Sequence, residues 1–557
     1  MKMKLNYLLN FKLQKEKMFI LLITMILIIY KFFWSAIAAS WREDEATVIW
    51  IADNLSSINT HVGLVSSVGL PNPNLLILFS KIFTILDSLI SVSLFIAFLN
   101  IIFIYLALKN KENDYKNILL FSLIGFSTYL SQHTIEPWGQ SVLITTNSLF
   151  LYILFRFVVN KQYYVFPLFP VIAILPSGIY LAGLTNSIVY SLFFAIFTLL
   201  NIKNIKSFFT NKYINLISVT LLFLIIRLTW IPFFNKVNLN AISKVGNSPY
   251  DVLLIFIERY KNTVKSLFGF WVDERSYYFP ITDVNIISNS TNDIYQVFLR
   301  FHWFLQRYAL LNILLIFILL IFFQKMLDMN YVNKIFILIF YLFLFTSISP
   351  AIGGREFLKY QRMDNYIETY FIYLYLWFFV GFCYKNLKIS KLLNFLNSIL
   401  IIVFITFNIY FSYYILLDNY QNRSSILSES DVPMLYKQQI MEFIVDDWSK
   451  TGDSNEIPIF YDLGGGIYDW VNDFGTYYSP YYSSNPYTIG RGFDYILKKK
   501  YDLSNSQEGK QFRNIEEARY IISYTFSTEN LEIYSKYENN YFGRLRLSIN
   551  NNFDLNN

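Results

Sequence analysis

The chain has 557 residues and a formal net charge of +7; 55% of its residues are hydrophobic, 20% are aromatic and only 15% are charged. An average soluble domain is about 25% charged, so this composition excludes a soluble enzyme, a coiled coil and a disordered scaffold. The bilayer must be part of the solvent for so much apolar surface, and a mean hydropathy of +0.38 agrees. One cysteine and three widely separated histidines also argue against a disulfide or a Cys/His metal cluster.

Long apolar runs begin near the N-terminus and continue through most of the chain. Crossing the hydrocarbon core takes about 20 apolar residues. The first run, Met18 to about Ala38, is too long for a signal peptide and lacks a clean cleavage site, which favours a signal anchor. The sequence therefore predicts an α-helical polytopic membrane protein of about eleven spans. The ten further runs lie near 89–108, 117–130, 139–159, 164–182, 184–200, 213–233, 306–324, 334–350, 366–384 and 393–416.

Lysine and arginine residues cluster in alternate short loops, and basic short loops face the cytoplasm in membrane proteins. This pattern predicts a cytoplasmic N-terminus and, with an odd number of spans, an extracytoplasmic C-terminal part. The basic excess is then a topology signal, so no nucleic-acid partner is expected. A composition rich in Ile, Asn, Lys and Tyr suggests a bacterial source, and hence the inner (plasma) membrane.

Two domains are expected, a membrane domain at 1–416 and an extracytoplasmic domain at 417–557. The second contains the strand-like runs IPIFYD, ARYIISYTF and GRLRLSI and a helix-like run, MLYKQQIMEFIVDDW, which predict a small α/β fold. The outer side also holds a first loop at 39–88 and a long loop at about 234–305. The cytoplasmic connectors are too short to bind ATP, so any chemistry is expected at the outer face.

The first outer loop opens with an acidic motif, Trp41-Arg42-Glu43-Asp44-Glu45-Ala46-Thr47. Ionisable groups at the membrane edge are costly and are often functional. A carboxylate there could accept the proton of an attacking hydroxyl or amine, or hold a divalent cation together with a phosphate. The alternative is a solvated helix start with acidic residues in its first turn.

A proline-marked segment, Gly69-Leu70-Pro71-Asn72-Pro73-Asn74, follows in the same loop. It leads into LLILFSKIFTILDS, which is too short to span a bilayer and predicts an interfacial or re-entrant helix. After the next cytoplasmic loop comes the outer turn Gln132-His133-Thr134-Ile135-Glu136-Pro137-Trp138.

The order of these features resembles the GT-C superfamily of integral-membrane glycosyltransferases, most closely its protein O-mannosyltransferase and aminoarabinose-transferase branch. The resemblance covers about residues 18–160. It rests on Asp44-Glu45-Ala46, on the Gly69–Asn74 segment and on Pro137-Trp138. Asn74 stands where that branch often has a second proline. Glu136 stands where it usually has an arginine, so a basic role cannot be transferred to that position.

The resemblance implies transfer of a sugar from a polyprenyl-phosphate donor to a glycan, lipid or protein acceptor at the outer face. It implies that Asp44 is the general base and that Glu45 assists, by orienting the acceptor or by contacting a divalent metal ion. No other cofactor is implied. His133, Glu136 and Trp138 could face the same acceptor cavity, although a helix cap at Pro137 is the plainer interpretation of this turn.

The leaving lipid phosphate needs cations to stabilise its developing charge. Three basic residues in the late loop at 353–366 are spaced to share one helical face, and they contradict the positive-inside trend. Lipid-headgroup anchoring is the alternative for them, snorkelling for Lys81 and a pair within the bundle for Arg227. The candidate phosphate ligands are Lys81, Arg227, Arg355, Lys359 and Arg362.

Two other functions remain open at this point. An O-antigen polymerase or ligase would rely on arginines and a histidine in a large outer loop, without an early acidic pair. A lipid-linked glycan transporter or flippase would show internal repeats and broken helices in corresponding halves, and the sequence shows no such repeat. A polyprenyl-phosphate-sugar-dependent glycosyltransferase therefore fits the sequence best.

Overall fold

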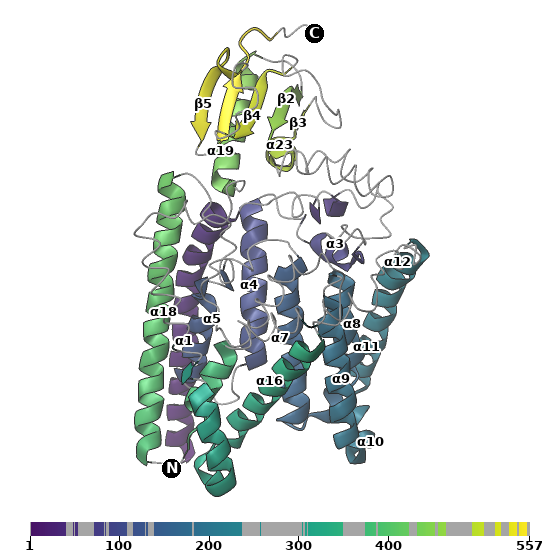
Figure 1. The fold of residues 1–557 in the computed structure, drawn as a ribbon, viewed down its shortest axis with the longest axis vertical. Coiled ribbons are helices and arrows are strands. Elements are labelled where there is room, and N and C mark those ends of the chain that lie inside the picture. Colours follow the sequence, from purple (N-terminus) through teal and green to yellow (C-terminus); the bar gives the residue numbers. More distant parts are fainter. Residues whose placement is uncertain are drawn as a thin grey trace.

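The computed structural model of the chain describes a helical bundle with a small sheet region at one end (Figure 1). The N-terminus and the short helix α10 (Ile205–Phe208) lie at the end of the bundle opposite the sheet. The described residues are 2–39, 48–49, 51–53, 72–82, 84, 89–108, 115–128, 130–131, 139–180, 183–236, 257, 304, 307–308, 310–348, 374–385, 388–422, 432–451, 455–463, 493–505, 518–524, 534–542 and 545–553.

Each of the eleven apolar runs contains helical residues in the described part of the chain, because long apolar segments satisfy their backbone groups within a helix. Two of these helices continue into a π-helical turn, η1 (Trp34–Ala38) after α1 and η6 (Ile226–Trp230) after α11. Two helical stretches lie at Leu310–Phe322 and 374–382. The other bundle helices are α1 (Lys2–Phe33), α4 (Leu89–Leu108), α5 (Tyr115–Gly125), α7 (Gly139–Val158), α8 (Leu168–Ile179), α9 (Leu184–Leu200), α11 (Lys212–Ile225), α12 (Ile231–Lys236), α16 (Met329–Ile348) and α18 (Lys388–Asn422).

Four helical segments in the described residues are long and apolar enough to cross a membrane: Met18–Ala38, Ser141–Val158, Lys212–Asn235 and Ser390–Leu417. A fifth candidate is the pair Leu184–Leu200 and Ile202–Phe208, which is bent by 78°. The coarse prediction of a mostly helical chain with several candidate spans is therefore confirmed. The count of eleven spans stays a prediction.

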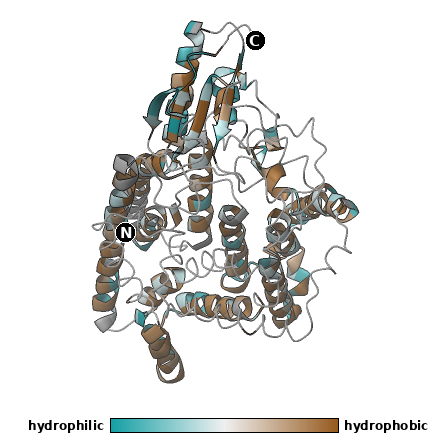
Figure 2. Cartoon of the chain, turned by 45° about the horizontal axis from the view of Figure 1, so that its top comes forward, coloured by the Kyte–Doolittle hydropathy of each residue, from teal (hydrophilic) through white to brown (hydrophobic). Residues whose placement is uncertain are grey.

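Burial separates central from peripheral helices. The apolar window of α7 is 78% buried, against 22% in the windows of α11 and α18, so α7 lies inside the bundle and the other two line its outside. Hydrophobic residues cover the bundle helices in Figure 2, whereas the sheet region alternates between polar and apolar. Apolar side chains on outward helix faces are what a lipid-facing surface requires.

The predicted interfacial helix is shorter than its apolar run. Helix α3 (Leu75–Ser80) has six residues, and the chain turns at Lys81 and Ile82. Lys81 closes this helix as its C-terminal cap residue, and its backbone N–H still donates to the Ile77 carbonyl. Helix α3 lies at the same end of the bundle as the sheet region (Figure 1).

The C-terminal region combines helix and sheet, as expected from its sequence. Two parallel pairings, β1–β3 and β2–β4, and two antiparallel pairings, β4–β6 and β5–β6, build a two-stranded and a four-stranded sheet of order β2-β4-β6-β5. The predicted runs became α19, β1, β2, β4 and β6, whereas α23, β3 and β5 were not predicted. The elements are α19 (Met434–Thr451), β1 (Glu456–Ile457), β2 (Ile459–Asp462), α23 (Phe493–Tyr501), β3 (Ser504–Asn505), β4 (Tyr520–Tyr524), β5 (Glu538–Phe542) and β6 (Leu545–Ile549).

Candidate functional site

Most of the predicted site residues lie outside the described residues, and their roles stay predictions. Lys81 and Arg227 are the two predicted site residues that the structure describes. The others are Asp44, Glu45, His133, Glu136, Trp138, Arg355, Lys359 and Arg362.

Lys81 is exposed at the end of α3, where its Nζ donates a hydrogen bond to the backbone carbonyl of Asp53 at 3.0 Å. The Asp53 carboxylate in turn forms an ion pair with Lys499 Nζ at 2.7 Å. Asp53 belongs to the loop predicted at 39–88, and Lys499 belongs to α23. One acidic residue thus joins the first loop, the turn after α3 and the C-terminal region at one end of the bundle.

The segment before α3 is packed firmly against the end of a distant span. Asn72, Pro73 and Asn74 are buried, and Asn74 Nδ2 donates to the carbonyl oxygen of Leu228 at 3.2 Å. Leu228 lies within η6, and the usual donor to its carbonyl, four residues later, would be Pro232, which has no backbone N–H. The proline-marked segment of the sequence therefore fixes the start of α3 beside η6.

Arg227 precedes Leu228 in η6, and its side chain is exposed. Arg227 and Lys81 make no direct contact, but α3 begins beside η6 and ends at Lys81. A six-residue helix is about 9 Å long, so α3 links the neighbourhoods of these two cations. The structure therefore places both of them around α3 without joining them into one cluster.

A buried polar cluster, which the sequence analysis missed, lies where α1 meets residues 126–131 and α18. Tyr30 OH lies 2.6 Å from Ser412 Oγ, and Thr128 Oγ1 donates to the Asn408 carbonyl at 3.0 Å. Lys31 is fully buried, and its Nζ donates to Ser131 Oγ at 2.6 Å. A single lysine within the first apolar run was the signal that could have revealed this cluster.

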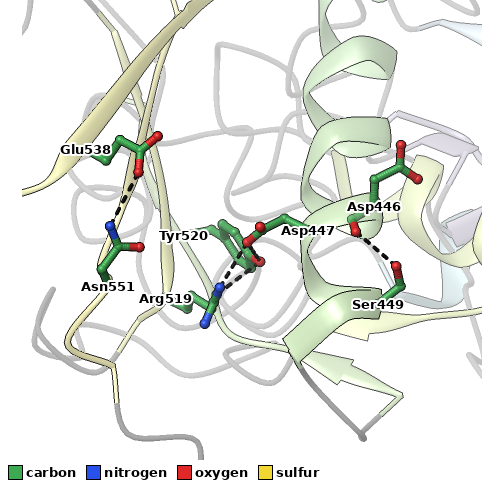
Figure 3. Close-up of polar contacts among 7 residues, drawn as sticks. All are labelled: Asp446, Asp447, Ser449, Arg519, Tyr520, Glu538 and Asn551. Carbon is green, nitrogen blue, oxygen red and sulfur yellow. Dashed lines mark hydrogen bonds and ion pairs between the residues drawn. The ribbon is translucent and has the colours of Figure 1, made fainter.

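A second missed network holds the C-terminal region together (Figure 3). Asp447 of α19 accepts hydrogen bonds from Arg519 Nη2 at 3.0 Å and from Tyr520 OH at 2.7 Å. Burial acts to raise the pKa of Asp447, but these two donors lower it more, and the net pKa lies below the ordinary carboxyl value. Burial and the Asp447 hydrogen bond raise the pKa of Tyr520. This closed network anchors α19 to the sheet.

No group of three or more His, Cys, Asp and Glu side chains suited to a metal ion occurs among the residues that the structure describes. Asp44 and Glu45, the residues predicted to hold a divalent ion, lie outside that part of the chain. Comparison with known proteins adds no family: no family model, no curated protein and no solved structure matches the chain.

Proposed function

We propose that this chain is a membrane glycosyltransferase that uses a polyprenyl-phosphate-linked sugar at the outer face of a bacterial inner membrane. In the proposed reaction an acceptor hydroxyl attacks the anomeric carbon of the sugar while the bond from that carbon to the phosphate oxygen breaks. Asp44 takes the hydroxyl proton, and the polyprenyl phosphate leaves with the bonding electron pair. The acceptor is a glycan, a lipid or a protein.

The observation that carries the proposal is the junction at Asp53. It joins the loop that contains the acidic motif to Lys81 and to Lys499 of the C-terminal region. A transferase needs its base, the donor phosphate ligands and the acceptor-binding part close together, because orientation of the reactants supplies much of the rate. The junction supports this gathering at the end of the bundle opposite the N-terminus.

Basic side chains have the second proposed role, which is to bind the phosphate of the donor. Arg355, Lys359 and Arg362, with Lys81 and Arg227, would stabilise the charge that develops on the departing phosphate. Arginine suits this role because its guanidinium group stays charged and forms paired hydrogen bonds with phosphate oxygens. Glu45 would orient the acceptor or share a divalent ion with Asp44, and the turn with His133, Glu136 and Trp138 would line the acceptor side.

Transfer can be tested with the purified full-length chain and a panel of undecaprenyl-phosphate pentoses, hexoses and N-acetylhexosamines, with release of undecaprenyl phosphate as the readout. We expect Asp44→Asn to lower the rate by about 10²- to 10⁴-fold, the usual contribution of a general base. The neighbouring change Glu43→Gln is the matched control and should keep the rate within about threefold of wild type.

The phosphate ligands are tested in the same assay. Arg355→Ala and Arg362→Ala should each lower donor turnover about tenfold or more, since a hydrogen bond to a charged group is worth about 1.5–3 kcal/mol, while the yield of inserted protein stays unchanged. Equal rates for Asp44→Asn and wild type would refute the base assignment. Wild-type donor turnover in both arginine variants would refute the phosphate assignment.

A further inference from the structure

The end of α1 nearest the C-terminal region carries three buried hydrogen-bond donors on one face. Lys31, Trp34 and Ser35 are each 0% exposed, and their spacing of three and four residues places them on one side of a helix. The segment from Trp34 is the π-helical turn η1, in which Ala39 N donates to the Trp34 carbonyl at 3.1 Å. Such π-helical turns occur frequently at functional sites.

These three donors are poorly satisfied. Ser35 Oγ has no hydrogen-bond partner among the described residues, and Trp34 Nε1 faces the Tyr30 hydroxyl without forming a hydrogen bond of normal geometry with it. Lys31 makes a single hydrogen bond, to Ser131 Oγ, and its Nζ lies 5.4 Å from the centre of the Tyr30 ring. An ammonium group has three N–H donors, so two of them have no partner among the described residues. Across the described residues, no carboxylate forms an ion pair with Lys31.

An arrangement of this kind is costly unless something binds to it. A buried donor without a partner costs about 1–3 kcal/mol, and an unpaired buried charge costs more. All three groups donate, one of them is cationic, and no anion of the described chain reaches them. Their natural complement is an anion with several acceptor oxygens, and a phosphate monoester provides three terminal oxygens.

The position of the donor face limits where this phosphate comes from. Lys31 lies within the candidate span Met18–Ala38, seven residues before its end, which is about 10 Å along a helix. Ala39, directly after η1, accepts a hydrogen bond from Met434 N at 3.0 Å, so the face lies just below the first helix of the C-terminal region. A phosphate at this depth, close to the membrane edge, is most readily supplied by a lipid.

We propose that Lys31, Trp34 and Ser35 form a binding site for the phosphate of an isoprenoid-phosphate lipid. The choice of an isoprenoid chain rests on the proposed function, whereas the phosphate assignment rests on the three donors alone. Lys31 contributes charge, and Trp34 Nε1 and Ser35 Oγ fix the orientation of the phosphate. Ser131 holds the ammonium group in place, since its own proton is used on the Ser127 carbonyl at 2.6 Å.

The test measures lipid binding by the purified full-length chain in detergent, using native mass spectrometry and the shift of the melting temperature. The probes are undecaprenyl phosphate, undecaprenol, phosphatidylglycerol and inorganic phosphate. We expect undecaprenyl phosphate to bind and to raise the melting temperature, undecaprenol and inorganic phosphate to have little effect, and phosphatidylglycerol to bind more weakly. Lys31→Met should weaken undecaprenyl phosphate binding about tenfold or more, and Ser35→Ala and Trp34→Phe about three- to tenfold.

Matched controls make the same chemical changes elsewhere in the bundle. Lys334→Met alters another buried lysine, which lies against the rings of Phe155 and Phe379. Trp377→Phe and Ser218→Ala each remove a buried donor that has no partner. These three variants should bind undecaprenyl phosphate as the wild type does. If Lys31→Met yields no folded protein, the binding of undecaprenyl phosphate by Ser35→Ala tests the site, because this variant loses only one hydroxyl group.

Three results would overturn the site: wild-type affinity in Lys31→Met and Ser35→Ala, equal binding of undecaprenol, or equal stabilisation by inorganic phosphate, which would indicate a free anion in place of a lipid. Stronger binding of phosphatidylglycerol would overturn the isoprenoid assignment. Because binding needs no sugar, the outcome is independent of transfer. Binding that depends on Lys31 in a chain without transferase activity would refute the proposed function alone, and transfer with unaltered binding in Lys31→Met would refute this site alone.

Discussion

Two buried cations in this chain have opposite surroundings. Arg519, in the C-terminal region, shares Asp447 with Tyr520 and also donates from Nε to the Tyr520 hydroxyl at 3.1 Å (Figure 3). Lys31, at the end of α1, has one neutral hydroxyl partner and two neighbouring donors that have none. The first cation belongs to a closed network, and the second belongs to a set of donors that has no acidic partner among the described residues.

The comparison separates a structural role from a binding role. A buried charge that is paired and hydrogen-bonded holds its partners in place, and its loss leaves them unpaired. A buried cation without a carboxylate partner lowers the stability of the ligand-free protein, and its charge is compensated only when an anion binds. Replacing Arg519 should therefore destabilise the folded protein. Replacing Lys31 should stabilise the lipid-free protein and weaken lipid binding.

The largest difference is expected when each cation is replaced by an apolar side chain of similar length. Arg519→Met should lower the stability of the sheet region by about 2 kcal/mol, since it removes the ion pair with Asp447, and the loss is limited because the partly exposed carboxylate recovers some hydration. Lys31→Met should raise the stability of the lipid-free bundle by about 1–2 kcal/mol, because it removes an unpaired buried charge.

Hydrogen exchange resolves both effects within one protein, through the amides of β4 and β6 for the sheet and those of η1 and α5 for the bundle. Arg519→Lys keeps the charge but lacks the planar guanidinium group that contacts both Asp447 and Tyr520, and it should recover only part of the loss. A loss of stability in both Met variants would mean that Lys31 is structural, as Arg519 is, and the contrast would disappear.

A smaller pair of effects is expected from two serines. Ser523 Oγ accepts a hydrogen bond from Arg546 Nε at 3.1 Å, so Ser523→Ala should lower the stability of the sheet region by about 1–2 kcal/mol. Ser35 Oγ has no partner, so Ser35→Ala should leave the stability of the lipid-free protein unchanged or raise it by up to about 1 kcal/mol. Thermal unfolding in detergent, with and without undecaprenyl phosphate, measures both; a clear loss of lipid-free stability in Ser35→Ala would contradict the assignment of an unoccupied donor.

The sequence predicted the helical class, the first span and the α/β character of the C-terminal region because hydrophobic length and periodicity encode them directly. It did not predict that α3 ends at Ser80, because the apolar run continues beyond that residue and the turn is set by tertiary contacts such as the one between Lys81 and Asp53. Strand β5, with the sequence ENNYF, is polar and pairs only with β6, so its sequence carries little strand signal.

Site prediction was limited for a similar reason. The spacing of residues within one segment can indicate a shared helical face, but it cannot show which distant residues meet that face. The ion pair between Asp53 and Lys499 joins residues from opposite halves of the chain, and the hydrogen bond between Asn74 and Leu228 joins residues 154 positions apart. The sequence analysis did not single out Lys31, because only the structure shows that this residue is buried and has few partners.

The smallest expected effect is a pH dependence that arises from the Asp447 carboxylate, a partner that Arg519 has and that Lys31 lacks among the described residues. The pKa of Asp447 in the folded protein is below its ordinary value, because the hydrogen bonds from Tyr520 and Arg519 and the nearby charge of Lys450 outweigh the effect of burial. A depressed pKa stabilises the folded state above the ordinary carboxyl pKa of about 3.9, and this contribution is lost as the pH falls from there through the folded pKa. We expect protection of the β4 amides, corrected for intrinsic exchange, to decline below about pH 4 by less than about 1 kcal/mol, since water screens the exposed part of the side chain. In Asp447→Asn the decline in protection should be shallower. An identical decline would mean that other carboxylates cause it and that the charge of Asp447 does not stabilise the network around Arg519.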